Sequence, residues 1–234
     1  MCERIAQYRL KQVYAEAMGW PAVPFEDNAC DRIANWNVPP GSQPWLMHRL
    51  RGRQPRIDMV NWGYRPAWAA HAGIPLATRV RFDQALLGPY FKSLVTTGRA
   101  VVPVDGWYEW TKADDVRQPW FVQRKTRHPF FLAAISSFRP HRAAIDDSGF
   151  IIVCDSTDGG IVNPVEQRPI VMDAHTAACW INPDIRLEEA AEAAHACRIN
   201  REEFEWFKVT LDVNRYASNG CDLITPLTVH GRRS

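Results

Sequence analysis

The first periodic feature of the chain is a run of apolar residues at helical spacing. Apolar side chains recur every three or four positions between Gln7 and Met18, which predicts an amphipathic helix that Gly19 and Pro21 terminate. The same pattern predicts three further helices, at about Asp83 to Leu94, Asp173 to Ile181 and Leu187 to Cys197. Asp173 is placed to cap the N-terminus of its helix.

Much of the remaining sequence consists of short β-branched and aromatic runs separated by turn signals, which is typical of strands. Asp105-Gly106 lies between two such runs and predicts a hairpin turn, because glycine tolerates a positive φ. That turn would place Glu109 on the outgoing strand. The predicted strands are Arg99 to Val104, Trp107 to Thr111, Pro119 to Gln123, Pro129 to Ser136, Gly149 to Cys154, Arg168 to Met172, Phe207 to Leu211 and Leu223 to Leu227.

Strands that follow one another directly, with few helices between them, favour antiparallel pairing. We therefore expect an α+β fold: a mostly antiparallel β-sheet, curled or barrel-like, with flanking helices. No segment resembles a linker, so one domain is expected over residues 1–234. No glycine-rich phosphate loop opens a helix, and no cofactor is expected.

The composition is that of a folded soluble protein, with 46% hydrophobic and 23% charged residues. The longest apolar stretches are far shorter than the roughly 20 residues that a membrane-spanning helix needs. The N-terminus also lacks the features of a secretory signal. A cytoplasmic protein without a membrane span is expected.

Six cysteines are scattered along the chain, without the close spacing that zinc sites require. No metal site is expected. In a reducing compartment, the cysteines other than Cys2 are expected to be mostly buried apolar residues.

The formal net charge of +2 does not by itself indicate a nucleic-acid partner. Local arginine clusters can simply be solvated hairpin tips. Ten tryptophans change this assessment, because single-stranded nucleic acid binds to grooves that combine cations with aromatic faces. The two clusters are Arg49, Arg51, Arg53 and Arg56, and Arg124, Lys125 and Arg127.

Cys2 carries the most distinctive candidate chemistry. Removal of Met1 would leave an α-amine and a thiol on one residue, which titrate near about pH 8 and about pH 8.5. The amine can form a Schiff base with an aldehyde, and the neighbouring thiol can then close a thiazolidine ring. Cys2 is therefore a candidate nucleophile toward aldehydes.

A series of short motifs spans nearly the whole chain. They are Met1-Cys2-Glu3-Arg4, Trp36-Asn37-Val38-Pro39-Pro40-Gly41, Trp62-Gly63-Tyr64-Arg65-Pro66-Ala67-Trp68, Thr78-Arg79-Val80, Gly98-Arg99, Asp105-Gly106-Trp107-Tyr108-Glu109-Trp110, Gln118-Pro119, Gln167-Arg168-Pro169-Ile170-Val171 and Leu223-Ile224-Thr225-Pro226. In content and order they resemble the SOS response-associated peptidase (SRAP) family. These abasic-site-processing proteins crosslink a mature N-terminal cysteine to abasic DNA.

The resemblance implies that Cys2 is the crosslinking nucleophile and that Glu109 is the active-site glutamate. A carboxylate in this position can shuttle protons during imine and thiazolidine formation. The resemblance also places Asn37 near the nucleotide beside the reactive cysteine, although an asparagine in such a turn can equally stabilise the turn itself.

Three further residues resemble DNA contacts of the family. Trp68 would stack on bases, and Arg79 would neutralise phosphates, with Arg4 beside it. The implied partner is single-stranded DNA that contains abasic sites, and no oligomeric state is indicated.

Two departures from the family pattern concern the active site. Ala77 replaces an asparagine in the motif that normally reads Asn-Ala-Arg-Val-Glu, whose final glutamate is Arg81 here. Val165 replaces the active-site histidine, and its isopropyl group cannot transfer a proton. That proton transfer must then be absent, slower, or carried out by Glu166 or water.

Three interpretations follow. The leading one is an enzyme of the DNA damage response that shields abasic sites as a thiazolidine crosslink, with autopeptidase or lyase activity less secure. The first alternative is a diverged DNA-binding paralogue with weak or no crosslinking chemistry, because Ala77 and Val165 replace the asparagine and histidine. The second is an N-terminal-nucleophile peptidase.

Overall fold

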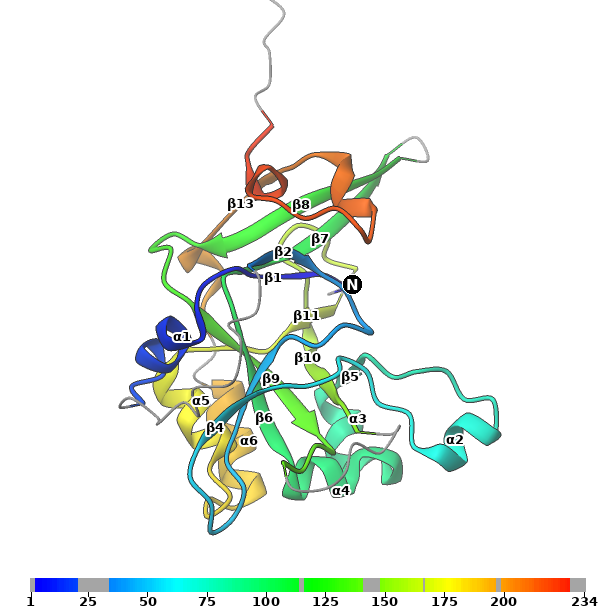
Figure 1. The fold of residues 1–234 in the computed structure, drawn as a ribbon, viewed down its shortest axis with the longest axis vertical. Helices are drawn as coiled ribbons and strands as arrows, with labels where there is room; N and C mark the ends of the chain where they lie inside the picture. The colour runs from blue at the N-terminus through cyan, green and yellow to red at the C-terminus, as the bar shows by residue number, and fades with distance from the viewer. Residues whose placement is uncertain are drawn as a thin grey trace, which may run out of the picture.

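The computed structural model describes residues 3–20, 34–113, 116–140, 148–165, 167–196 and 199–227, which form a mixed α+β fold on two sheets (Figure 1). The first sheet has the order β13 (Phe204–Lys208), β8 (Val116–Arg124), β7 (Gly106–Ala113), β1 (Ile5–Gln7) and β2 (Asn35–Val38). The second has the order β11 (Gln167–Pro169), β10 (Phe150–Gly159), β9 (Phe130–Ser136), β6 (Arg99–Val104), β3 (Trp45–His48) and β4 (Arg56–Met59), with β12 (Val171–Met172) on β9 and β5 (Arg79–Arg81) on β10.

The predicted α+β class with mostly antiparallel pairing is confirmed. Within the described part of the chain, β5 runs parallel to β10, and the other pairs of named strands are antiparallel. The strands divide between two separate sheets, and neither sheet closes into a barrel. The curled or barrel-like form is therefore not observed.

Helices form in all four segments where the sequence predicts them, and also at α2, which the sequence pattern does not indicate. The helices are α1 (Lys11–Ala17), α2 (Ala67–His71), α3 (Phe82–Leu87), α4 (Pro89–Thr97), α5 (Ala174–Ile181) and α6 (Leu187–Ala196), with short 3-10 helices η1 (Arg201–Glu203), η2 (Leu211–Asn214) and η3 (Cys221–Ile224). The Asp173 side chain accepts a hydrogen bond from the Thr176 N–H and caps α5, as predicted. The helix predicted from Asp83 is instead two helices, because Pro89 begins a new helix directly after Gly88.

The strand predictions hold best in the interior of the sheets. β6 has the predicted bounds, and β7, β8, β9 and β10 contain or closely match the predicted segments. Strands β1 to β5 carry no pattern that predicted them. The strand predicted from Leu223 to Leu227 is wrong, because that segment begins in η3 and continues without strand pairing. The helix predicted from Gln7 is also too long, since Ile5–Gln7 pairs with β2 and β7 instead.

The hairpin predicted at Asp105-Gly106 is wrong. β6 pairs with β3 and β9, whereas β7 pairs with β1 and β8, so the dipeptide carries the chain from one sheet to the other. Gly106 is required by close approach, because a Cβ atom there would lie 2.6 Å from the Val122 carbonyl oxygen and would overlap the Phe121 ring. The Asp105 carboxylate accepts hydrogen bonds from the Tyr8 N–H, the Arg9 guanidinium and the Tyr14 hydroxyl.

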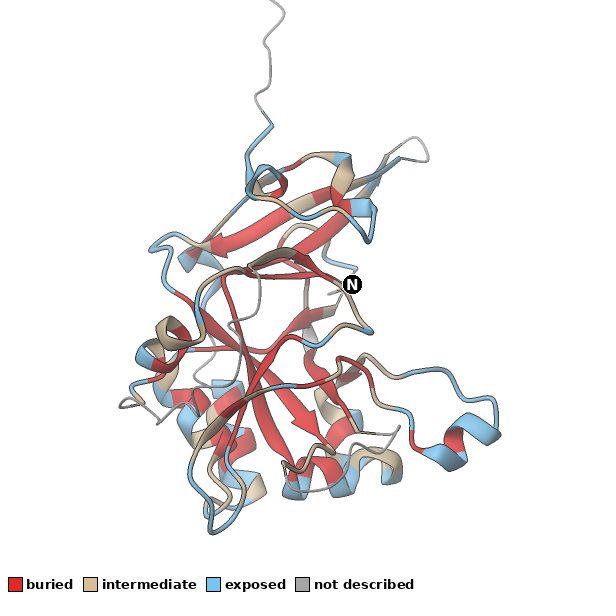
Figure 2. Cartoon of the chain, in the orientation of Figure 1, coloured by how far each residue is buried: buried red, intermediate tan, exposed pale blue. Residues whose placement is uncertain are grey.

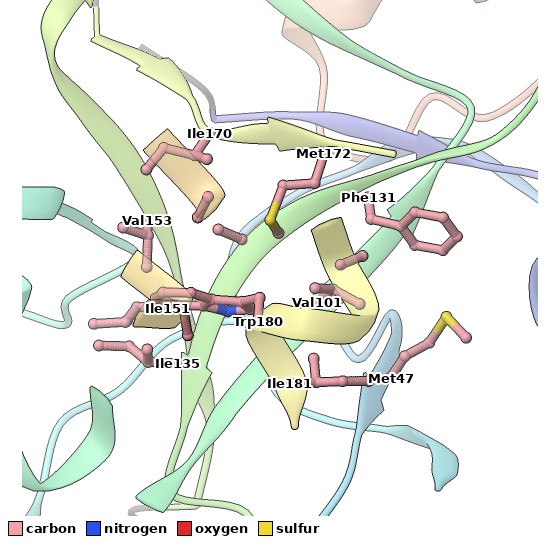
Figure 3. Packing of buried hydrophobic residues seen from close by; sticks show 14 of the residues in the cluster. Met47, Val101, Phe131, Ile135, Ile151, Val153, Ile170, Met172, Trp180 and Ile181 are labelled. Atoms are coloured by element: carbon pink, nitrogen blue, oxygen red, sulfur yellow. The ribbon is translucent and has the colours of Figure 1, made fainter. Parts of the chain in front are cut away.

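Three buried clusters hold the layers together. One lies between the second sheet and the helices, where Trp180 of α5 packs among Val101, Ile135 and Ile151 (Figure 3). Another fills the space between the two sheets, and a third lies between the first sheet and the segment from Val209 to Leu223. Figure 2 shows buried residues along the central strands of both sheets, whereas α2 lies on a largely exposed extension.

None of the helices in the described ranges is both long and apolar enough to cross a bilayer. Those same ranges contain no cluster of three or more His, Cys, Asp or Glu side chains suited to a metal ion. The expectation of buried cysteines holds for Cys154, because its thiol is buried and this burial raises its pKa to about 12. It does not hold for Cys221, which is exposed. Cys2, Cys30 and Cys197 lie outside the described residues.

Asp58 on β4 is a carboxylate whose partners are expected to make the stability of the protein sensitive to acid. Its carboxylate accepts hydrogen bonds from His48 at 2.8 Å and from Arg56 at 3.1 Å. Burial acts to raise the pKa of Asp58, but these hydrogen bonds outweigh it and lower the pKa below its usual value. A lowered folded pKa contributes stability above the unfolded pKa of about 3.9, and this contribution is lost as the pH falls through the folded pKa.

Asp58→Asn is therefore expected to lower the Tm most near neutral pH, with a difference from the unmodified protein that shrinks below about pH 4. Thermal unfolding followed by circular dichroism between about pH 3 and pH 7 measures this difference. A Tm difference that stays constant across that range would contradict the assignment.

Candidate functional site

Glu109 of β7 lies in a pocket of N–H donors at the centre of the candidate site. Its side chain is buried, with 2% exposure. Oε1 accepts hydrogen bonds from Trp107 Nε1 at 3.0 Å and from the Ile161 N–H at 2.9 Å. Oε2 accepts from the backbone N–H groups of Val162 at 2.7 Å and Asn163 at 3.3 Å. A buried carboxylate requires such partners, and here three of the four come from one loop.

That loop connects β10 to β11, and its approach to Glu109 depends on glycine. A Cβ atom at Gly160 would lie 2.6 Å from Glu109 Oε2. Asn163 Nδ2 donates to the Trp110 carbonyl at 3.0 Å, and Arg201 donates to the Ile161 carbonyl at 2.8 Å. The sequence analysis did not single out Gly160, although a Gly-Gly pair at a strand end is a signal of close backbone approach.

Val165 lies on the same loop, where the family resemblance expects a histidine. The side chain is 93% exposed, and the Val165 N–H donates to Asn163 Oδ1 at 3.2 Å. Ala77 instead forms an antiparallel bridge with Tyr64 through both of its backbone groups and packs against the helix-side core. Neither residue presents a side chain that can exchange a proton.

Arg4 and Arg79 are brought to one region by Glu3. The Glu3 carboxylate pairs with Arg79 at 3.8 Å and with Arg117 of β8 at 2.9 Å. Arg4 is buried, donates to the Glu3 carbonyl at 2.9 Å and lies over the ring of Tyr216. Cys2, the neighbour of Glu3 in the chain, lies outside the described residues. The sequence analysis missed Arg117 and Tyr216, which no motif marks.

Trp68 lies apart from this region, on α2. Its side chain is 58% exposed, and its ring packs edge-on against Tyr90 at 5.4 Å between centroids. Figure 1 shows α2 at the end of an extension, away from β7. An exposed tryptophan on such an extension suits contact with a ligand, and its DNA role stays a prediction.

Asn37 of β2 is buried and holds both η2 and the segment that follows it. Its Nδ2 donates to the carbonyl groups of Val213 at 3.2 Å, Arg215 at 3.0 Å and Ser218 at 3.2 Å. Asn37 therefore has a structural role, which is similar to the alternative in which an asparagine at this position stabilises a turn. A position beside a bound nucleotide stays a prediction.

Four of the seven cations in the two clusters pair with acidic side chains. The first cluster flanks the hairpin turn between β3 and β4, as expected for a hairpin tip, whereas the second lies where the chain passes from β8 of one sheet to β9 of the other. These ion pairs reduce the cationic charge that both clusters offer to a nucleic acid. The ion pairs are Arg51 with Asp184, Arg56 with Asp58, Arg124 with Glu203 and Arg127 with Glu205.

Two abasic site processing proteins are similar to this chain in sequence, and a solved structure is similar to it in fold, over most of the length of each. The chain is 32% identical over 230 residues to the abasic site processing protein YedK of Escherichia coli (strain K12), covering 97% of this chain and all of that protein. It is 22% identical over 194 residues to the abasic site processing protein YoaM of Bacillus subtilis (strain 168), covering 81% and 84%. The crystal structure of a phage-related protein from Bordetella bronchiseptica superposes with a TM-score of 0.74 at 28% identity, covering 89% of this chain and 94% of that one.

The model of the SOS response associated peptidase (SRAP) family matches residues 1–216. This range includes Glu109, the loop that holds it, and the arginines around Glu3. The match covers most of the chain, and the chain therefore belongs to the SRAP family.

Proposed function

We propose that this protein processes abasic sites in single-stranded DNA and captures them through Cys2 as a thiazolidine crosslink. Two relatives are named as abasic site processing proteins, and the chain retains both Cys2 and Glu109. The observation that carries the proposal is the buried Glu109 carboxylate, held by four N–H donors. Such pre-organisation suits a group that exchanges protons with a bound substrate.

The proposed chemistry needs no external oxidant or reductant. Once Met1 is removed, the α-amine of Cys2 adds to the aldehyde carbon of the open abasic sugar, and loss of water leaves an imine. The Cys2 sulfur then bonds to the imine carbon, and the thiol proton passes to the nitrogen, which closes the ring. Glu109 would relay these protons. Its longest hydrogen bond, the 3.3 Å contact from the Asn163 N–H to Oε2, would break so that Oε2 can accept a proton instead.

The arginines around Glu3 would bind the DNA backbone. Arg79 and Arg117 both pair with the Glu3 carboxylate, and a phosphate group can take over these cations from the carboxylate. Trp68 would add stacking on a more distant base. Binding that rests on such contacts weakens as the salt concentration rises, because phosphate neutralisation releases counterions.

A second candidate function is DNA binding with weak or no crosslinking. It is favoured by Val165, whose exposed isopropyl group occupies the loop position of the family histidine, and by Ala77. The N-terminal-nucleophile peptidase has no separate observation in its favour.

Incubation of the purified protein with an abasic single-stranded oligonucleotide tests the proposal. We expect an adduct that survives denaturing electrophoresis and disappears in Cys2→Ala. Cys221→Ala is the matched control, because Cys221 is an exposed thiol on η3. The adduct should persist in this control.

The mass of the intact protein supplies a further check, since the chemistry requires an N-terminal Cys2. Adduct formation by protein that retains Met1, or an adduct that survives Cys2→Ala, would refute the thiazolidine mechanism. Binding of the oligonucleotide without any adduct would support the second candidate function.

A further inference from the structure

Tyr216 is an exposed aromatic residue supported by a buried cation. It follows η2 and is 70% exposed, although its ring lies only 3.9 Å from the guanidinium carbon of Arg4, measured to the ring centroid. Arg4 itself is 4% exposed. The guanidinium therefore covers one face of the ring, and most of the remaining ring surface faces solvent.

The backbone on both sides of Tyr216 is held in place. Asn37 Nδ2 donates to the Arg215 and Ser218 carbonyls, and the Ser218 N–H donates to the Arg215 carbonyl at 3.2 Å. Asn37 is itself buried on β2. The ring is therefore presented on an anchored segment, which reduces the entropy that a ligand loses when it stacks on it.

The surroundings of the ring are cationic as well as aromatic. Arg4 uses Nη1 to donate to the Glu3 carbonyl, while its buried Nε has no hydrogen-bond partner among the described residues. The side chain of the preceding residue, Glu3, pairs with both Arg79 and Arg117. An open aromatic face beside several arginines is the combination that binds single-stranded nucleic acid without sequence preference.

We propose that Tyr216 is the platform on which a base beside the abasic site stacks, and that Arg4 holds the ring from beneath. This inference rests on the proposed function. Arg4 lies two residues from Cys2 in the chain, so a base on this platform would be held close to the reactive residue. Because every base has a π-face, the platform accepts any sequence next to the lesion.

Affinity measurements on three variants test the platform. The probe is a fluorescent single-stranded oligonucleotide with one tetrahydrofuran residue, an abasic analogue that has no aldehyde and cannot crosslink. Tyr216→Leu is expected to weaken binding about tenfold, whereas Tyr216→Phe keeps the aromatic face and should stay within about twofold. Leu211→Ala, at an exposed apolar residue of η2, is the matched control and should bind like the unmodified protein.

A stacking reporter separates this role from a merely structural one. 2-Aminopurine placed on either side of the tetrahydrofuran residue loses fluorescence when it stacks. We expect quenching on one side with the unmodified protein and with Tyr216→Phe, and its loss with Tyr216→Leu at saturating protein. Circular dichroism should show the same thermal unfolding for both Tyr216 variants.

Equal affinity of Tyr216→Leu and the unmodified protein, or identical quenching in both, would overturn the platform while leaving the proposed function intact. An unmodified protein that fails to bind the oligonucleotide at all would overturn the proposed function, and the platform with it.

Discussion

Glu109→Gln is expected to slow adduct formation with abasic single-stranded DNA by about 10²- to 10⁴-fold, the usual contribution of a positioned acid or base. The glutamine amide has nearly the same shape as the carboxylate but cannot relay a proton at neutral pH. One of its two terminal atoms also becomes an NH₂ donor that faces backbone N–H groups of the loop at 161–163. Single-turnover rates from denaturing gels measure the effect.

The same substitution should also reduce stability. Each buried group left without a partner costs about 1–3 kcal/mol, so the free energy of unfolding in urea should fall by an amount of that order. Glu205→Gln is the matched control, because Glu205 lies on β13 of the same sheet, is only partly buried, and pairs with Gln123 and Arg127 rather than with this loop. A Glu109→Gln variant that forms the adduct at the unmodified rate would remove Glu109 from the chemistry.

Val165→His is expected to accelerate adduct formation, or its reversal, by up to about 10²-fold. The new imidazole would lie on the loop whose backbone N–H groups bind Glu109, and at a position with 93% exposure it has room without disturbing the core. Stability should therefore change by less than about 0.5 kcal/mol. Affinity for undamaged single strands should stay nearly unchanged.

Val165→Gln is the control for polarity, because its amide has similar reach but no proton to exchange at neutral pH. The double variant Ala77→Asn and Val165→His restores both family residues. Ala77 packs against the core, so this variant is compared only after its folding has been verified. Rates unchanged in both histidine variants, with folding and affinity intact, would show that the protein uses another proton-transfer group or needs none.

Local sequence signals determined the elements whose stability is itself local. The Asp173 cap and the apolar face of α5 predict that helix correctly, and the continuous apolar run of β6 predicts a buried strand with the observed bounds. The aromatic run from Trp107 to Thr111 likewise placed Glu109 on a strand. These predictions succeed because capping and burial patterns are determined by residues within one element.

The tertiary structure decided which elements pair and which groups meet at the site. Asp105-Gly106 carries a hairpin signal, yet β6 and β7 join different sheets, and the glycine serves the close approach to Phe121. The donors to Glu109 at 161–163 lie about fifty residues further along the chain. Tyr216 reaches Arg4 on a segment that Asn37 anchors from β2. Such contacts depend on long-range packing, which local propensity does not specify.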